Sequence, residues 1–228
     1  MSGVRRPLRA LSTVLIIAGV LMLSDAALTV AWQEPVSGTY AWIVQDRLGG
    51  DLRELEDARP DAAERAALAA LESKRRRIAF LARVLRRSAG RGDAVGRIRI
   101  PKIKANYVVV DGTDTASLRK GPGIYDEVPF PGAPGTTAIA GHRTTYLAPF
   151  RRIDRLARGD GIVLEMPYAR LTYEVEERRI VAPTEVSVVK RVAFDRLVLS
   201  ACHPLYSAAK RIVVFARLVG EQPRGAAT

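Results

Sequence analysis

The 228-residue chain has very little cysteine and histidine. It contains one cysteine, Cys202, and two histidines, His142 and His203. A single cysteine excludes an internal disulfide framework, and no CxxC pair or Cys/His set with zinc-ligand spacing is present. No acidic cluster with the spacing of a cation site stands out either. We therefore expect neither a metal site nor a cofactor.

Acidic and aromatic residues are also scarce. The chain has 36 Lys and Arg against 24 Asp and Glu, a formal net charge of +12, and only 6% aromatic residues. Residues 74–91 hold eight basic side chains and no acidic one. A charge of this size is typical of proteins that bind nucleic acid or an anionic surface. The basic stretch lacks the interleaved aromatics of a single-strand binder, so we expect anionic lipid headgroups near it and no nucleic acid.

A long apolar run stands at the N-terminus. Residues 10–32 are almost wholly apolar, and Arg5, Arg6 and Arg9 precede them. A helix needs about 20 such residues to cross a bilayer, and the positive-inside rule puts residues 1–9 in the cytoplasm. A cleaved signal peptide is the alternative, but the run exceeds an h-region of about 7–15 residues and no clear A-x-A site follows. We expect a single-pass signal anchor over residues 10–32, with the rest of the chain outside the cell.

Residues 33–93 are expected to form a helical stalk or linker. The stretch is rich in Ala, Leu, Arg and Glu, and it is divided by glycines at 49–50 and by Pro60. Two interpretations stay open: a stalk with a coiled-coil contact, and a solvated, partly ordered linker, which we favour. Leucine and isoleucine recur at spacings of three, four and seven, which can make one narrow apolar stripe. The stripe consists of Leu68, Leu71, Ile78, Leu81 and Leu85.

From residue 94 to residue 220 the chain reads as a mainly β domain, followed by a tail over residues 221–228. Short β-type runs separated by Gly, Pro and Asp turn signals predict an antiparallel barrel or sandwich. The clearest helix spans residues 148–156, with Phe150, Ile153 and Leu156 on one face. The expected strands are residues 95–100, 107–110, 136–141, 162–166, 171–181, 196–202 and 211–219.

Cys202 follows an apolar run that reads as a buried strand. A thiol at the rigid end of a core strand is well placed for nucleophilic chemistry, although free cysteine is also among the most buried residue types. A thiol with the ordinary pKa of about 8.5 needs a nearby base or cation to react near neutral pH. His203 adjoins Cys202, but neighbouring side chains of an extended segment point to opposite faces. His142, at the end of another apolar strand, is the better partner.

Acyl transfer also needs a group that stabilises a developing oxyanion. Arg211 opens the last expected strand, nine residues after Cys202. A connection of that length can return the chain beside the strand it has just left, which would bring Arg211 alongside the thiol. The alternative, a solvated arginine at a strand start, stays open on spacing alone.

Five segments of the chain resemble the sortase family, with class E as the most similar group. They are residues 98–103 (IRIPKI), 121–123 (GPG), 140–146 (AGHRTTY), 201–204 (ACHP) and 207–211 (SAAKR). The resemblance covers a little over half of the chain, and the His, Cys and Arg come in the family's order and spacing. It implies a closed eight-stranded sortase-type β-barrel with short helices, behind a transmembrane helix and a helical stalk.

The resemblance also implies the chemistry. Cys202 would attack the Thr–Gly carbonyl of a C-terminal sorting signal in an exported protein, His142 would act as acid and base, and Arg211 would hold the substrate carbonyl or oxyanion. An amine of a peptidoglycan precursor or a pilin lysine would then resolve the thioester. Class E resemblance implies a Leu-Ala-x-Thr-Gly signal rather than Leu-Pro-x-Thr-Gly, a preference associated with a tyrosine at the place of Tyr107. Thr144 is the other expected substrate-binding residue.

The chain departs from the family pattern in two places. Ala201 stands where the family usually has a threonine before the cysteine, and the loop over residues 183–194 is short for class E. Both departures bear on rate and signal preference. Two other functions stay open: a cysteine hydrolase that releases its acyl group to water, and an anchored, non-catalytic binding module with a structural cysteine.

Overall fold

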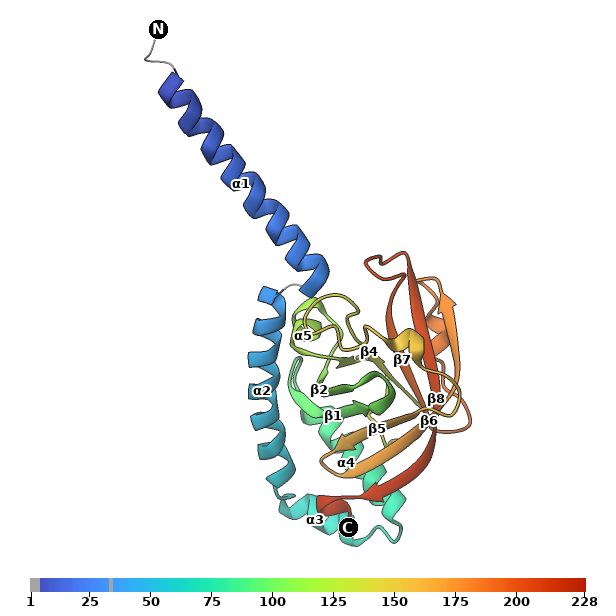
Figure 1. Ribbon diagram of the computed structural model, residues 1–228. Coiled ribbons are helices and arrows are strands. Elements are labelled where there is room, and N and C mark those ends of the chain that lie inside the picture. Colours follow the sequence, from blue (N-terminus) through green and yellow to red (C-terminus); the bar gives the residue numbers. More distant parts are fainter. Residues whose placement is uncertain (1–4, 33–34) are drawn as a thin grey trace.

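The computed structural model describes residues 5–32 and 35–228, and eight of its strands close into a barrel (Figure 1). Around the barrel the strands follow the order β1-β2-β3-β4-β7-β8-β6-β5. Along β6, residues of the inner face such as Leu171 and Tyr173 alternate with exposed ones, as a strand with one buried face requires. The strands are β1 (Ala94–Ile100), β2 (Ala105–Asp111), β3 (Gly123–Ile124), β4 (Thr136–Ala140), β5 (Gly161–Met166), β6 (Ala169–Val181), β7 (Arg196–His203) and β8 (Lys210–Pro223).

The closed eight-stranded barrel confirms the mainly β part of the predicted fold class, and each expected strand is present with its ends shifted by a few residues. The barrel is not wholly antiparallel as expected from the sequence, because β2 pairs with β3, and β4 with β7, in parallel. The structure adds β3, which has only two residues and begins at the last glycine of the Gly-Pro-Gly turn signal at residues 121–123. β3 bridges β2 and β4, so this short strand closes one side of the barrel.

Helices precede the barrel and one short helix follows β2. They are α1 (Arg5–Trp32), α2 (Pro35–Asp57), α3 (Ala62–Ala69), α4 (Lys74–Ser88) and α5 (Thr115–Lys120). In Figure 1, α1 projects away from the barrel and α2 runs along β1 and β2. In the part of the chain that the structure describes, no helix has the length and apolar character of a membrane span. The anchor over residues 10–32 stays a prediction, and residues 1–4 and 33–34 lie outside the described residues.

Helices α2 and α4 pack against the barrel, so the expectation of a solvated linker is wrong. Ile78 and Ala82 of α4 are fully buried in the barrel core. Leu48 and Leu52 of α2 form a second apolar cluster with β2. The apolar stripe predicted from the sequence is narrow because α4 buries only one of its faces against the barrel.

Several basic residues of the 74–91 stretch are bound by carboxylates of the barrel. Arg75 pairs with Asp195, and Arg91 pairs with Asp126. These side chains therefore attach α4 and the segment after it to the barrel. The contact of the basic stretch with anionic lipid headgroups stays a prediction.

The expected helix over residues 148–156 is also wrong. Phe150, Ile153 and Leu156 are buried as predicted, but the regular structure in this stretch is a single 3₁₀ turn, Ile153–Arg155. Backbone φ is positive at the three residues Tyr146, Leu147 and Ala148 (49°, 63° and 43°), a conformation that a right-handed helix excludes. Apolar residues spaced three apart fit a series of turns as well as a helix.

Candidate active site

The three predicted catalytic residues stand at matching positions at one end of neighbouring strands. β4 and β7 are parallel with Ala140 opposite Ser200, so His142 and Cys202 each come two residues later. β7 and β8 are antiparallel, with Arg211 directly opposite Cys202. Directly opposite residues project from the same face of a sheet. The register thus places a histidine, a cysteine and an arginine at the ends of three adjacent strands.

The backbone at His142 is fixed from both sides. The Gly141 amide donates to the Ser200 carbonyl over 3.0 Å, and the Phe150 amide donates to the His142 carbonyl, also over 3.0 Å. A Cβ at residue 141 would lie 2.6 Å from Cδ2 of Phe150, so only glycine fits directly before the histidine. His142 is therefore held at the end of β4 by β7 and by the loop that follows it.

The His142 ring is half-buried, with an aromatic ring and a positive charge near it. Its Nε2 atom is buried and has no hydrogen-bond partner among the described residues, and its ring centroid lies 5.4 Å from that of Tyr146. Burial, and secondarily the positive charge of Arg119, lower the pKa of His142 below its ordinary value. The imidazole is therefore neutral near pH 7, which is the form that can accept a proton from a thiol.

A groove of about 330 Å³ begins beside Arg211. Ser200 also lines it and lies on the same face of β7 as Cys202, because side chains alternate along a strand. The guanidinium of Arg211 donates to the carbonyls of Ala208 and Lys210 over 3.0 and 3.1 Å, which holds it at the groove. The other walls are mainly apolar and come from the segment after β3 and the β6–β7 connection: Val128, Val181, Ala182, Pro183, Val186, Val188 and Val189.

Arg143 is a residue of the site that sequence reasoning missed. It is only 5% exposed, and its guanidinium donates to the Cys202 carbonyl over 3.4 Å and to Asp154 Oδ1 over 2.9 Å. It also lies 3.4 Å from Nδ1 of His203. The arginine directly after His142, at the end of an apolar strand, was the signal available in the sequence. His203 therefore contacts Arg143, and the prediction that it is not the partner of the thiol stays a prediction.

The two expected substrate-binding residues lie apart from the groove. The Tyr107 hydroxyl donates to the Leu147 carbonyl over 3.2 Å, so this tyrosine supports the loop after His142. Thr144 is half-buried in the same loop, and neither residue lines the groove beside Arg211. Their contact with substrate stays a prediction.

Ala201 faces away from the thiol. It is 3% exposed and belongs to the barrel core, while its neighbours Ser200 and Cys202 project from the other face of β7. The side chain before the cysteine thus packs in the core. On the face of β7 that carries the thiol, the nearest hydroxyl along the strand is that of Ser200, and its oxygen lies 2.8 Å from the Tyr125 hydroxyl oxygen.

Comparisons with known proteins agree with this geometry. The sortase-domain family model matches residues 98–219. Sortase D of Bacillus subtilis is 34% identical over 132 residues, 56% of this chain and 65% of the relative. Sortase SrtE1 of Streptomyces coelicolor is 29% identical over 149 residues, 58% of this chain and 42% of the relative. This chain therefore spans less than two thirds of the length of either relative.

A solved structure adds to these relatives. Sortase E from Streptomyces avermitilis is 32% identical, with a TM-score of 0.54 over 59% of this chain and 93% of that one. The comparisons thus support the resemblance to class E and add a class D relative to it. The family model covers more than half of the 228 residues and includes His142, Cys202 and Arg211, and on this basis the chain belongs to the sortase family.

Proposed function

We propose that this protein is a cysteine transpeptidase that cleaves the Thr–Gly bond of a C-terminal sorting signal and transfers the acyl group to an amine. The observation that carries the proposal is the register of β4, β7 and β8, which puts His142, Cys202 and Arg211 at matching positions, with a mainly apolar groove that starts at Arg211. An extended peptide in that groove would have its apolar side chains against the β6–β7 connection and its scissile carbonyl at the thiol.

The reaction follows from the groups present. The Cys202 sulfur attacks the threonine carbonyl carbon, His142 takes the thiol proton, and the guanidinium of Arg211 stabilises the oxyanion. His142 then gives the proton to the leaving glycine amine as the C–N bond breaks, which leaves a thioester. An acceptor amine attacks the thioester, loses its proton to His142 and releases Cys202 as the thiol.

The proposal is tested with the full chain, a Leu-Ala-x-Thr-Gly peptide and a triglycine amine, and the products are read by mass spectrometry. The expected product is the ligated peptide, with a thioester on Cys202 when the amine is left out. Cys202→Ala should give neither product. A Leu-Pro-x-Thr-Gly peptide run in parallel measures the preference for the second residue of the signal.

Other outcomes identify the alternatives. Cleaved peptide without ligated product, at saturating amine, would make the protein a cysteine hydrolase. Full ligation by Cys202→Ala would refute the mechanism. A Cys202 that resists alkylation across the pH range, with no turnover of either peptide, would leave an anchored binding module.

We also infer that residues 10–32 anchor the protein in the cell membrane, with residues 1–9 in the cytoplasm and the barrel outside. The support is the apolar run and the three arginines that precede it. Alkaline carbonate extraction of membranes that contain the full chain should leave it in the pellet, and protease added to intact spheroplasts should digest the barrel. Release by carbonate would contradict the anchor.

A further inference from the structure

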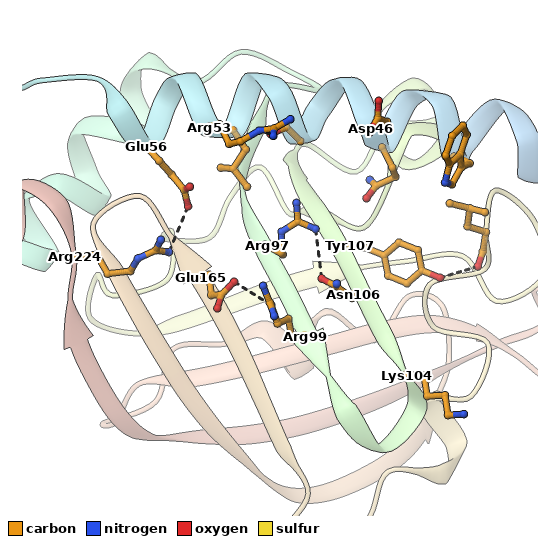
Figure 2. A pocket seen from close by; sticks show the side chains of 15 residues that line it. Asp46, Arg53, Glu56, Arg97, Arg99, Lys104, Asn106, Tyr107, Glu165 and Arg224 are labelled. Carbon is orange, nitrogen blue, oxygen red and sulfur yellow. Dashed lines mark hydrogen bonds and ion pairs between the residues drawn. The ribbon is translucent and has the colours of Figure 1, made fainter.

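A second, larger cavity of about 780 Å³ lies away from the groove at Arg211, between α2 and the outer face of β1 and β2 (Figure 2). Its volume is within the range of about 300–1,000 Å³ that small-molecule sites occupy. Figure 2 shows Arg97 pointing from β1 toward α2, and Lys104 at the turn that follows β1. This cavity is called the α2 groove below.

The lining of the α2 groove carries an excess of positive charge. Five cationic and three acidic side chains line it, a net charge of +2. The charged residues are Asp46, Arg53, Glu56, Arg97, Arg99, Lys104, Glu165 and Arg224. Arg99 pairs with Glu165 over 3.1 Å, and Arg224 pairs with Glu56 over 3.3 Å. Within each pair the two charges cancel. The net charge of +2 therefore comes from Arg53, Arg97 and Lys104 against Asp46.

The unpaired cations are Arg53, Arg97 and Lys104. Within residues 5–32 and 35–228, none of them has a carboxylate at ion-pair distance. Arg53 donates only to the Gly49 carbonyl of its own helix, and Arg97 reaches only the Asn106 amide oxygen, over a long 3.4 Å. Most N–H donors of the two guanidinium groups are therefore available to a ligand.

Gly49 leaves room for that ligand. A glycine in the interior of a helix costs about 1 kcal/mol relative to alanine, yet α2 has Gly49 in its middle, facing the groove. A Cβ at residue 49 would already lie 3.7 Å from Nη2 of Arg97, so any longer side chain would occupy the space beside that guanidinium.

We propose that the α2 groove binds a phosphate group, held by Arg53 and Arg97. A phosphate monoester carries about −1.5 to −2 charges, which matches the net +2 of the lining, and guanidinium groups bind phosphate oxygens in pairs. A single carboxylate would leave part of that charge unmatched. The phosphate can belong to a lipid headgroup or to a soluble metabolite, and both present the same chemistry.

The ligand would also contact the active-site side of the molecule. Tyr107 and Leu147 line the α2 groove, and Leu147 lies in the loop that follows His142. An occupant that fills the α2 groove would thus touch this loop. The inference does not depend on the transpeptidase proposal, because binding is measured without turnover.

Trp42 provides a local probe. It lines the groove and is 65% exposed, and Trp32 is the only other tryptophan. The full chain carrying Trp32→Phe, in a neutral detergent, is titrated with inorganic pyrophosphate and separately with a short-chain phosphatidic acid. A saturable change in Trp42 fluorescence is expected. Pyrophosphate binding alone identifies a soluble phosphate, phosphatidic acid binding alone identifies a lipid headgroup, and binding of both shows that the site accepts either.

Two variants and a matched control test the residues. Arg53→Gln with Arg97→Gln should weaken binding at least tenfold, and Gly49→Leu, which removes no charge, should do the same by filling the space. Arg83→Gln with Arg158→Gln removes two exposed cations elsewhere and should leave binding unchanged. The inference is overturned if neither probe gives a saturable change, if sodium chloride at equal ionic strength reproduces it, or if the Arg53/Arg97 variant binds as well as the control.

Discussion

At the scale of single residues, Arg143 connects the segment after β4 with the end of β7. It follows His142 in the chain and donates to the carbonyl of Cys202, so its loss would leave His142 and Cys202 less firmly positioned relative to each other, beyond the ladder that joins β4 and β7. A displacement of about 1 Å can reduce a rate about 100-fold. We expect Arg143→Gln to lower kcat of transpeptidation by about that factor, with a smaller change in KM.

Two further variants separate positioning from general damage to the fold. Arg143→Lys should recover part of kcat, because it keeps a cation but not the planar fork, while Arg152→Gln, a neighbouring exposed arginine, should have no effect. Steady-state kinetics measure both. An Arg143→Gln variant with unchanged kcat would show that Arg143 is only structural.

His142 offers a measurable electrostatic signature. Burial and Arg119 lower its pKa, so Arg119→Gln should raise the pKa toward the ordinary value of about 6.5 without reaching it, since burial is the larger cause. An NMR titration of the imidazole Cε1–H signal, in a His203→Gln background, checks this. An unchanged midpoint would rule out the charge of Arg119 as a cause.

The same pKa has a consequence for stability. Between the lowered pKa and about 6.5, the unfolded chain binds more protons at residue 142 than the folded chain does. The titration of His142 therefore lowers the free energy of unfolding as the pH falls through that window. Above about pH 6.5 it adds no pH dependence, because His142 is neutral in both states. Urea unfolding between pH 5 and pH 8, compared in wild type and Arg119→Gln, should show a smaller pH dependence in the variant.

At the scale of elements, variants in α4 test whether this helix is packed against the barrel or is a solvated linker. Ile78 is fully buried, and a Cβ at Gly132 would lie 2.6 Å from its Cγ2 atom. Ile78→Ala should lower the free energy of unfolding by about 2–5 kcal/mol. Arg83→Ala, on the exposed face of the same helix, should change it by about 0.5 kcal/mol or less. Equal, small effects in urea unfolding would restore the linker interpretation.

The elements also show what could be predicted from the sequence. β7 and β8 were predictable because their apolar runs are long and turn signals bound them. The alignment of Cys202 with Arg211 followed from the short connection, but the parallel pairing of β4 with β7 did not, since no local pattern encodes a non-local pair. The positive φ values at residues 146–148 were equally hidden, because none of these residues is glycine. The contacts of Arg143 depend on that same non-local pairing.

At the scale of the whole molecule, the helices and the barrel share their apolar clusters. Ile78 of α4 lies in the barrel core, and Leu48 and Leu52 of α2 cover Val108 and Val110 of β2. The C-terminal residues predicted as a tail take part as well, because Ala227 is fully buried and Arg224 pairs with Glu56 of α2. The boundary at residue 94 that the sequence suggests therefore cuts through a shared core.

Shortened chains test whether that core is indivisible. A chain of residues 35–228 should unfold in a single cooperative transition, whereas residues 94–220, the predicted barrel alone, would expose the surfaces that α2, α4 and the C-terminus cover. Exposed apolar surface of that kind binds dyes and destabilises the native state. We expect the 94–220 chain to bind 8-anilinonaphthalene-1-sulfonate and to lack a sharp thermal transition by circular dichroism. A 60–228 chain, which keeps α3 and α4, should have a thermal stability between those of the 35–228 and 94–220 chains. A 94–220 chain as stable as the 35–228 chain would mean that the helices cover the barrel without contributing to its stability, because the eight strands alone would then supply a sufficient core.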